Sequence, residues 1–159
     1  MYMSSLITPL GELFITGTHT AICAIAFERE HPNLARNNLT EQAKIELQEY
    51  FDLKRCSFTF PIAQPGTDFQ QQVWQHLLTI EAGKPISYAA LSRKMNHPLA
   101  IRAIAAANGK NKLMIVVPCH RVIGSSGKLV GYAGELWRKK WLLEHETALT
   151  GIGQSILKI

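Results

Sequence analysis

The segment Pro118-Cys119-His120-Arg121 places a thiol beside an imidazole and a guanidinium. A thiolate is a strong nucleophile, and a neighbouring imidazole or cation lowers the pKa of a thiol. Adjacent side chains on a strand point to opposite faces, so contact between Cys119 and His120 would require a turn or a bridging water. These residue types predict a reactive cysteine at position 119. The alternative is a small buried hydrophobe, a common role for free cysteine.

Two short predicted helices precede this segment. Ser87 can cap a helix that runs through residue 95, and a second helix is expected over residues 98–107, ending at Asn108-Gly109. The pair has the proportions of a helix-turn-helix. Its second helix is rich in alanine and carries one arginine, Arg102, so it offers few side chains that read base edges in the major groove. It suits close approach to a DNA backbone or minor groove, or else tight packing in a buried helical hairpin.

The other predicted elements divide the chain near residue 64. The first part is expected to be β-rich, with strands at 11–16, 21–27 and 56–62 and a helix from a Thr40 cap to residue 50. After a linker at 63–66, the second part is expected to be helical, with a capping box at 67–70 and a last helix over 135–147. The apolar run 113–117 that leads to the cysteine is strand-like.

The composition of the chain indicates the cellular compartment of the protein and excludes some classes of protein. The chain has 159 residues, and 17 Lys+Arg against 12 Asp+Glu gives a formal charge of 17 − 12, or +5, compatible with an anionic partner. The longest apolar run, 21–27, is far shorter than the roughly 20 residues of a membrane span. Three cysteines without a C-x-x-C argue against a disulfide framework or a structural zinc, and Cys23 and Cys56 are expected to be structural. We expect a cytoplasmic protein.

Several segments resemble the methylated-DNA–protein-cysteine methyltransferases, or O6-alkylguanine-DNA alkyltransferases. They run in order over roughly half the chain: Phe69, Ile86-Ser87-Tyr88, Asn108-Gly109-Lys110-Asn111, Pro118-Cys119-His120-Arg121-Val122, Gly131-Tyr132-Ala133-Gly134 and Leu142-Leu143-Glu144-His145-Glu146. The resemblance implies an α+β fold in two parts. A small ribonuclease-H-like βα domain at 1–64 is followed by a helical DNA-binding and alkyltransferase domain at 65–159, with a helix-turn-helix and a short strand carrying the acceptor cysteine.

The resemblance also implies an activity. A member of this family binds double-stranded DNA through the minor groove, without sequence preference, and flips out O6-alkylguanine or O4-alkylthymine. It transfers the alkyl group irreversibly to its own cysteine, here Cys119. Such a protein acts once and needs no metal or soluble cofactor. The sequence leaves the oligomeric state open, and a monomer is the default expectation.

Site roles follow by resemblance, position by position. The implied catalytic residues are Cys119 as acceptor, His120 as its base through water, Glu146 as the partner of His120, Asn111 as the residue that orders the active-site turn, and Tyr88 beside the extruded base. The implied DNA contacts are Arg102, as the finger that replaces the flipped base, with Tyr88 and the small residues Ala103, Ala106 and Gly109. The implied pocket comprises Val122, Tyr132, Ala133, Gly134 and Lys139.

Two positions depart from the family pattern. Glu135 stands where many members have a second glycine, so its carboxylate could bias the accepted alkyl group or cap the final helix. Asn108 replaces an apolar residue of some relatives and makes the end of the recognition helix more polar.

Three other functions stay open at this stage. One is a non-catalytic alkyltransferase-like binder of damaged DNA, although such proteins lack the acceptor thiol that Cys119 supplies. The others are a Cys-His hydrolase, which has no need of an alanine-rich helical hairpin, and a helix-turn-helix regulator, for which this helix has few base-reading side chains.

Overall fold

The computed structural model describes residues 1–124, 127, 132 and 135–151, and the chain forms two compact units. Unit 1 comprises Met1–Pro65 and Lys112–Val116, and unit 2 comprises Gly66–Asn111 and Val117–Ile159. Within the described ranges, no helix is both long enough and apolar enough to span a bilayer.

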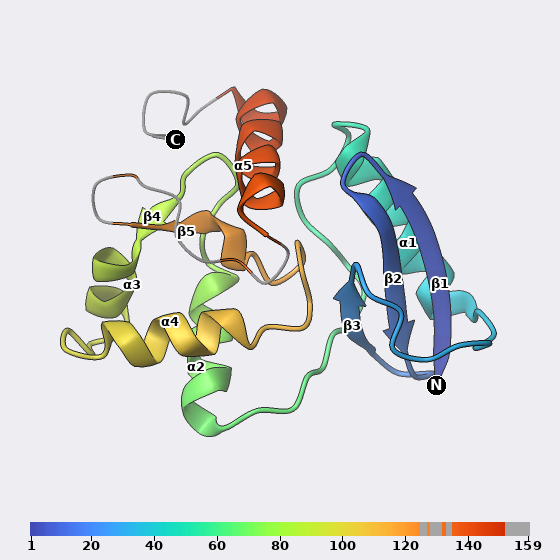
Figure 1. Cartoon of the computed structure of the whole chain (residues 1–159), viewed down its shortest axis with the longest axis horizontal. Helices are drawn as coiled ribbons and strands as arrows, with labels where there is room; N and C mark the ends of the chain where they lie inside the picture. The colour runs from blue at the N-terminus through green and yellow to red at the C-terminus, as the bar shows by residue number, and fades with distance from the viewer. Residues whose placement is uncertain (125–126, 128–131, 133–134, 152–159) are drawn as a thin grey trace. The chain divides into compact units, whose positions relative to one another are not determined.

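Unit 1 is an antiparallel sheet covered by one helix. Strands β1 (Tyr2–Thr8), β2 (Gly11–Gly17) and β3 (Ile22–Ala26) pair in that order, and α1 (Asn38–Phe51) packs on the sheet (Figure 1). The helix predicted to run to residue 50 is confirmed, and its residues Ala43, Leu47 and Tyr50 are fully buried. Strand β1, which is not among the predicted elements, pairs with β2 along its whole length.

The cap of α1 lies three residues before the predicted one. The side chain of Asn37 accepts a hydrogen bond from the Thr40 backbone N–H at 2.9 Å, and the Thr40 hydroxyl accepts one from the Asn37 backbone N–H at 3.0 Å. Thr40 is therefore the third helical residue of a capping box.

The strand predicted at 56–62 does not form; only Ile62 makes a bridge, to Ile22. A side chain takes the backbone hydrogen-bonding group that would otherwise pair with a neighbouring strand. The carboxylate of Glu46 accepts a hydrogen bond from the Thr59 backbone N–H at 2.8 Å, and Pro61 has no N–H to donate. Phe58 packs against Tyr50 of α1, and Phe60 packs against Phe58.

The strand predicted at 113–117 is also wrong beyond its first residue. Leu113 bridges to Ile25 of β3, but the chain then turns, with Val116 N–H donating to Met114 O at 2.8 Å. Ile115 lies at φ 74°, a left-handed conformation that is rare for a β-branched residue. The segment therefore reaches the cysteine through a strained turn.

Unit 2 is mainly helical, as predicted. Its elements are α2 (Asp68–Leu77), β4 (Ile86–Ser87), α3 (Tyr88–Lys94), α4 (Ile101–Gly109), the single-turn 3-10 helix η1 (Cys119–Arg121), β5 (Val122–Ile123) and α5 (Leu136–Thr150). β4 and β5 form a two-stranded parallel sheet, and α4 packs against both α2 and α3 (Figure 1). The cysteine is not on a strand: it opens η1, and β5 begins three residues later.

The helix-turn-helix is confirmed as α3 and α4, with different bounds for the second helix. Ser87 caps α3 by accepting a hydrogen bond from Ala90 N–H. Asn96, at φ 58°, ends α3, with His97 N–H donating to Ser92 O at 2.9 Å. The turn extends through residue 100, so α4 starts after the predicted position 98 and runs on to Gly109.

Glu135 occupies the N-cap position of α5, but its carboxylate makes no capping hydrogen bond. It accepts one from Trp137 Nε1 at 2.8 Å instead. Its backbone lies at φ 78° and ψ 149°, a region that is almost exclusive to glycine. The departure from the family glycine therefore places a side chain on a strained backbone.

We expect Glu135→Gly to raise the free energy of unfolding by about 1 kcal/mol, because glycine removes the strain while its greater freedom in the unfolded chain offsets part of the gain. Urea denaturation measures the change. Glu135→Ala is the matched control, since it removes the carboxylate but keeps a Cβ, and it should give no stabilisation. Equal stability of the glycine variant and the wild type would contradict the strain.

Candidate active site

The single turn η1 holds Cys119 in the interior of unit 2. Cys119 N–H donates to Val117 O at 2.8 Å, Arg121 N–H donates to Pro118 O at 3.0 Å, and Val122 N–H donates to Cys119 O. Cys119 is only 3% exposed. The turn thus fixes the backbone on both sides of the thiol.

A buried network of charged groups lies directly after the thiol. His120 Nε2 and Glu146 Oε2 are 2.8 Å apart, and both side chains are fully buried. Arg121 donates from Nε to Glu146 Oε1 at 2.8 Å and from Nη2 to Glu146 Oε2 at 2.9 Å, and from Nη1 to Ile80 O at 2.6 Å. Such bidentate pairing fixes a carboxylate in both position and charge.

This network sets the protonation of the imidazole. Burial alone would raise the pKa of Glu146, but the hydrogen bond from His120 and the charge and hydrogen bonds of Arg121 outweigh it, and the pKa lies below its usual range. Burial lowers the pKa of His120, against the attraction of Glu146, so the ring is neutral. An ionised Glu146 can only accept, which assigns the ring hydrogen to Nε2. His120 Nδ1 then carries a lone pair, and no described residue hydrogen-bonds to it.

The thiol itself is protonated at rest. Burial raises the pKa of Cys119, while a hydrogen bond from the side chain of Asn111 and the charge of Lys139 oppose the rise. The expectation that Arg121 would help to ionise the thiol is wrong, because its guanidinium is turned to Glu146. Cys119 therefore needs a base that takes its proton during the reaction.

Lys139 and Asn111 join the site from other elements. Lys139, on α5, is fully buried and donates from Nζ to Val122 O at 2.6 Å, so it does not form the surface pair with Glu135 that its spacing allows. Burial lowers the pKa of Lys139 to about 8. Asn111 is buried and donates from Nδ2 to Val117 O at 2.8 Å. This hydrogen bond joins the two residues of unit 2 that flank residues 112–116.

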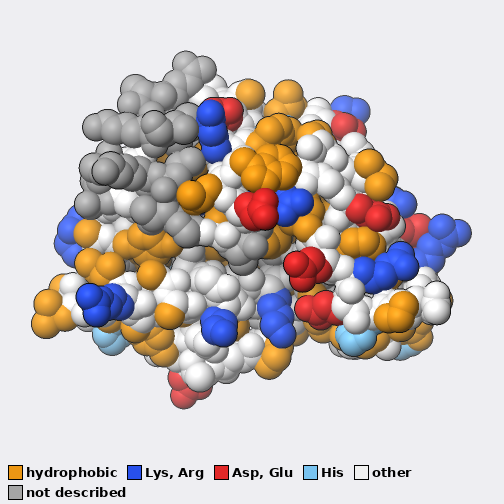
Figure 2. Space-filling view, viewed as in Figure 1, with side chains coloured by type: hydrophobic (Ala, Val, Ile, Leu, Met, Phe, Trp, Pro, Cys, Tyr) orange, Lys and Arg blue, Asp and Glu red, His pale blue; other side chains and the backbone are white. Residues whose placement is uncertain are grey.

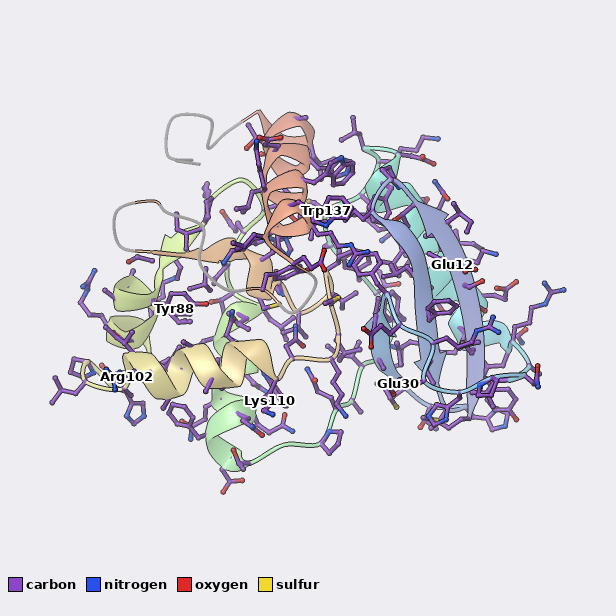
Figure 3. The ribbon with its side chains drawn as sticks, viewed as in Figure 1. Glu12, Glu30, Tyr88, Arg102, Lys110 and Trp137 are labelled. Atoms are coloured by element: carbon purple, nitrogen blue, oxygen red, sulfur yellow. The ribbon has the colours of Figure 1, made fainter. Side chains whose placement is uncertain are left out.

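Tyr88 lies at the start of α3 (Figure 3) and is linked to Cys119 through Asn108. Its hydroxyl accepts a hydrogen bond from Asn108 Nδ2 at 3.1 Å, and Asn108 Nδ2 also lies 3.3 Å from Cys119 O. Burial raises the pKa of Tyr88, helped by the nearby Cys119 and opposed by the Asn108 hydrogen bond. The phenol is therefore neutral and can donate its own proton.

The outer face of α4 carries the predicted DNA contacts. Arg102, Ala103, Ala106 and Gly109 are all exposed, at spacings that repeat along one side of the helix. Arg102 and Lys110 lie at opposite ends of α4 (Figure 3), and the surface around this helix shows Lys and Arg side chains separated by uncharged groups (Figure 2). Such a face combines positive charge with little steric bulk.

Three of the predicted pocket residues are described and two are not. Val122 is buried, Lys139 donates to its carbonyl, and Tyr132 places its hydroxyl in the interior with no hydrogen-bond partner among the described residues. Burial raises the pKa of Tyr132 well above its ordinary value. Ala133 and Gly134 lie outside the described residues.

Two functional contacts were missed by the sequence analysis. Arg121 was grouped with the thiol, and no spacing in the sequence indicates that it clamps a carboxylate 25 residues away. Asn108 was treated as a polar helix end, yet it is buried between Tyr88 and Cys119. The sequence did contain one signal for Asn108: it is a polar residue that follows a run of alanines and occupies a buried position of the helix.

Comparison with known proteins identifies relatives over both units. Residues 1–64 match the family model for the 6-O-methylguanine DNA methyltransferase, ribonuclease-like domain, and residues 68–148 match its DNA binding domain. The constitutive methylated-DNA--protein-cysteine methyltransferase of Bacillus subtilis is 41% identical, over 84% of this chain and 87% of the relative. The Mycobacterium leprae enzyme of that name is 38% identical over 92% of each. The crystal structure of Mycobacterium tuberculosis OGT in complex with DNA matches with a TM-score of 0.86 and 36% identity, over 94% of each chain.

The buried neutral imidazole predicts acid sensitivity. Below pH 6.5 the unfolded chain binds a proton at His120 that the folded chain does not, so the free energy of unfolding should fall by up to about 1.4 kcal/mol per pH unit. Glu146 adds to this loss only below its unfolded pKa of 4.5, because its folded pKa is lowered.

Urea unfolding at about pH 7.5 and about pH 5.5 measures this dependence. His120→Gln is the comparison, since its amide can still donate to Glu146 but does not titrate. The wild type should lose more stability than the variant on acidification. The same loss in both proteins would contradict a neutral buried His120.

Proposed function

The chain belongs to the 6-O-methylguanine DNA methyltransferase family, and on that ground we propose that it repairs double-stranded DNA by moving the alkyl group of O6-alkylguanine, and of O4-alkylthymine, to its own Cys119. The observation that carries this proposal is a buried thiol followed in the chain by a buried, neutral imidazole whose Nδ1 has no hydrogen-bond partner among the described residues. A thioether is not reversed by this site, so each molecule reacts once.

The transfer is a substitution at the alkyl carbon. The sulfur of Cys119 forms a bond to that carbon as the carbon–O6 bond breaks, and the electron pair of the broken bond stays on the guanine. The thiol proton passes to His120 Nδ1 through a bridging water, and the guanine takes up a proton in turn. The products are S-alkylcysteine and guanine, with no change in total charge.

The surrounding residues have separate tasks in this scheme. Glu146 holds His120 in the tautomer that accepts at Nδ1 and stabilises the imidazolium that forms, like the acid of a hydrolase triad. Asn111 and the charge of Lys139 favour the thiolate. Tyr88 is the hydrogen-bond donor to the departing base, because its phenol is neutral.

DNA binding is assigned to α4. A helix that enters the minor groove of any sequence needs small side chains, which Ala103, Ala106 and Gly109 provide on its exposed face. Extruding a base costs a few kcal/mol and leaves a gap in the stack. Arg102, exposed at the outer end of α4, is the side chain that fills the gap in this proposal.

We further propose that residues 65–159 form the domain for DNA binding and transfer, and that residues 1–64 form a separate N-terminal domain. The two family matches support this division, and the two compact units follow it except that Pro65 and residues 112–116 belong to unit 1. A monomer in the cytoplasm suits the chemistry, because all the assigned residues lie in one chain and the acceptor must remain a reduced thiol.

The alternatives are weaker. A silent damage binder does not require Cys119, and a hydrolase that turns over acyl groups requires an oxyanion hole, which alkyl transfer does not. A sequence-specific regulator would carry base-reading side chains on the face where α4 has alanines and glycine.

We expect Cys119→Ala to lose alkyl transfer completely and to keep its affinity for duplex DNA, since the thiol is buried and small. The intact mass before and after incubation with a duplex containing O6-methylguanine measures transfer, and peptide mapping locates the added methyl. Cys56→Ala, which removes an exposed cysteine, is the matched control and should react like the wild type. A mass gain in the Cys119 variant, or a methyl mapped elsewhere in the wild type, would refute the assignment.

We expect Arg102→Ala to weaken base flipping more than bulk binding, because the finger replaces the extruded base while other contacts hold the phosphates. Fluorescence of a base analogue opposite the damaged site reports flipping, and a gel-shift titration reports affinity. Lys110→Ala removes one charge from the other end of α4 and should lower affinity without changing flipping at saturation. Unchanged fluorescence in the Arg102 variant would rule out the finger role.

A further inference from the structure

Asn108 links three elements of unit 2 through a single buried nitrogen. It lies on α4, is 5% exposed, and places Nδ2 at 3.1 Å from the Tyr88 hydroxyl of α3 and at 3.3 Å from Cys119 O of η1. The neighbouring carbonyl, Ala107 O, accepts from Trp74 Nε1 at 2.9 Å, so this part of α4 is anchored to α2. The side-chain amide of Asn108 is therefore carried by a part of α4 that is held in place by α2.

The direction of these hydrogen bonds is determined by Cys119 O. A carbonyl only accepts, so the atom of Asn108 that faces it has to be the amide nitrogen. One amide hydrogen goes to Cys119 O and the other to Tyr88. The Tyr88 oxygen is then an acceptor toward Asn108, and its own hydrogen has to point elsewhere.

The energetics indicate that this arrangement is not there for stability. Asn108 Oδ1 is buried with no hydrogen-bond partner among the described residues, which carries a cost of about 1–3 kcal/mol. Cys119 O already accepts from Val122 N–H, and Tyr88 is only half-buried, so neither group depends on Asn108 for a partner. An apolar side chain of similar volume would fill the position without the unpaired oxygen.

We propose that Asn108 is a positioning residue for alkyl transfer, which turns the Tyr88 hydroxyl so that its proton faces the reacting base. The inference rests on the proposed function and deepens it. By accepting from Asn108, the phenol oxygen becomes a better donor of its remaining hydrogen. As the carbon–O6 bond breaks and its electron pair moves onto the guanine, that hydrogen is already directed at the growing negative charge.

The same contact connects DNA binding to the chemistry. Asn108 is on the helix whose opposite, exposed face carries the proposed DNA contacts, and its amide bonds the carbonyl of the acceptor cysteine. In this proposal, α4 therefore connects the bound DNA to the proton donor on α3 and to the acceptor cysteine on η1.

The test compares single-turnover rates of methyl transfer, at saturating duplex that contains O6-methylguanine, with free energies of unfolding. We expect Asn108→Leu to transfer about tenfold more slowly, the effect of one hydrogen bond, with unchanged or increased stability. Asn108→Asp should be at least as slow, because its carboxylate accepts the Tyr88 proton and diverts it. Asn38→Leu, at an exposed site on α1, is the matched control and should keep the wild-type rate.

Repeating the substitutions in a Tyr88→Phe background completes the test. Without the hydroxyl, Asn108→Leu should change the rate by less than about twofold, since the two residues act as one unit. A wild-type rate in Asn108→Leu, an equal loss in both backgrounds, or a rate loss that parallels a stability loss would each overturn the proposal. Failure of the wild type to transfer methyl at all would refute the proposed function instead.

Discussion

The carboxylate of Glu146 is ionised inside the protein, and an unpaired charge in that position would cost several kcal/mol. Arg121 offsets this cost with two parallel hydrogen bonds to Glu146, and its Nη1 donates to Ile80 O. Because an arginine does not deprotonate, the carboxylate stays charged throughout the physiological range. That fixed charge assigns the imidazole hydrogen of His120 to Nε2 and leaves Nδ1 as a base. The tautomer of His120 thus follows from the buried pair of Glu146 and Arg121.

The state of the thiol follows from the same burial. A surface cysteine beside Lys139 would ionise readily and would react with many electrophiles. Inside unit 2, burial keeps the Cys119 thiol protonated, and only removal of its proton by a positioned base makes it a nucleophile. For a protein that is consumed by one reaction, a protected thiol has value, because any side reaction would also consume the molecule.

Local sequence signals predicted much of this structure, and contacts between distant segments account for the errors. Ser87 and the alanine-rich helix identified the helix-turn-helix, because capping and helical spacing act within a few residues. The strand at 56–62 failed because Glu46, ten or more residues away, takes a backbone N–H that the ladder would use. In the site, the residue types alone are enough to identify Cys119 and His120 as candidate reactive residues. The role of Glu146 came only from family resemblance, and the clamp by Arg121 came only from the fold.

Helix α4 shows why so plain a sequence can support specific chemistry. In the proposed function, alanine and glycine on the exposed face of α4 leave the backbone free to approach DNA of any sequence, and these side chains do not distinguish damaged from undamaged DNA. Recognition then depends on whether an extruded base can lie against the sulfur and the Tyr88 hydroxyl. Asn108, on the buried side of this helix, bonds groups at both of those places. Under the proposed function, selectivity is therefore a property of the reaction geometry, and the buried side of α4 is where substitutions should alter it.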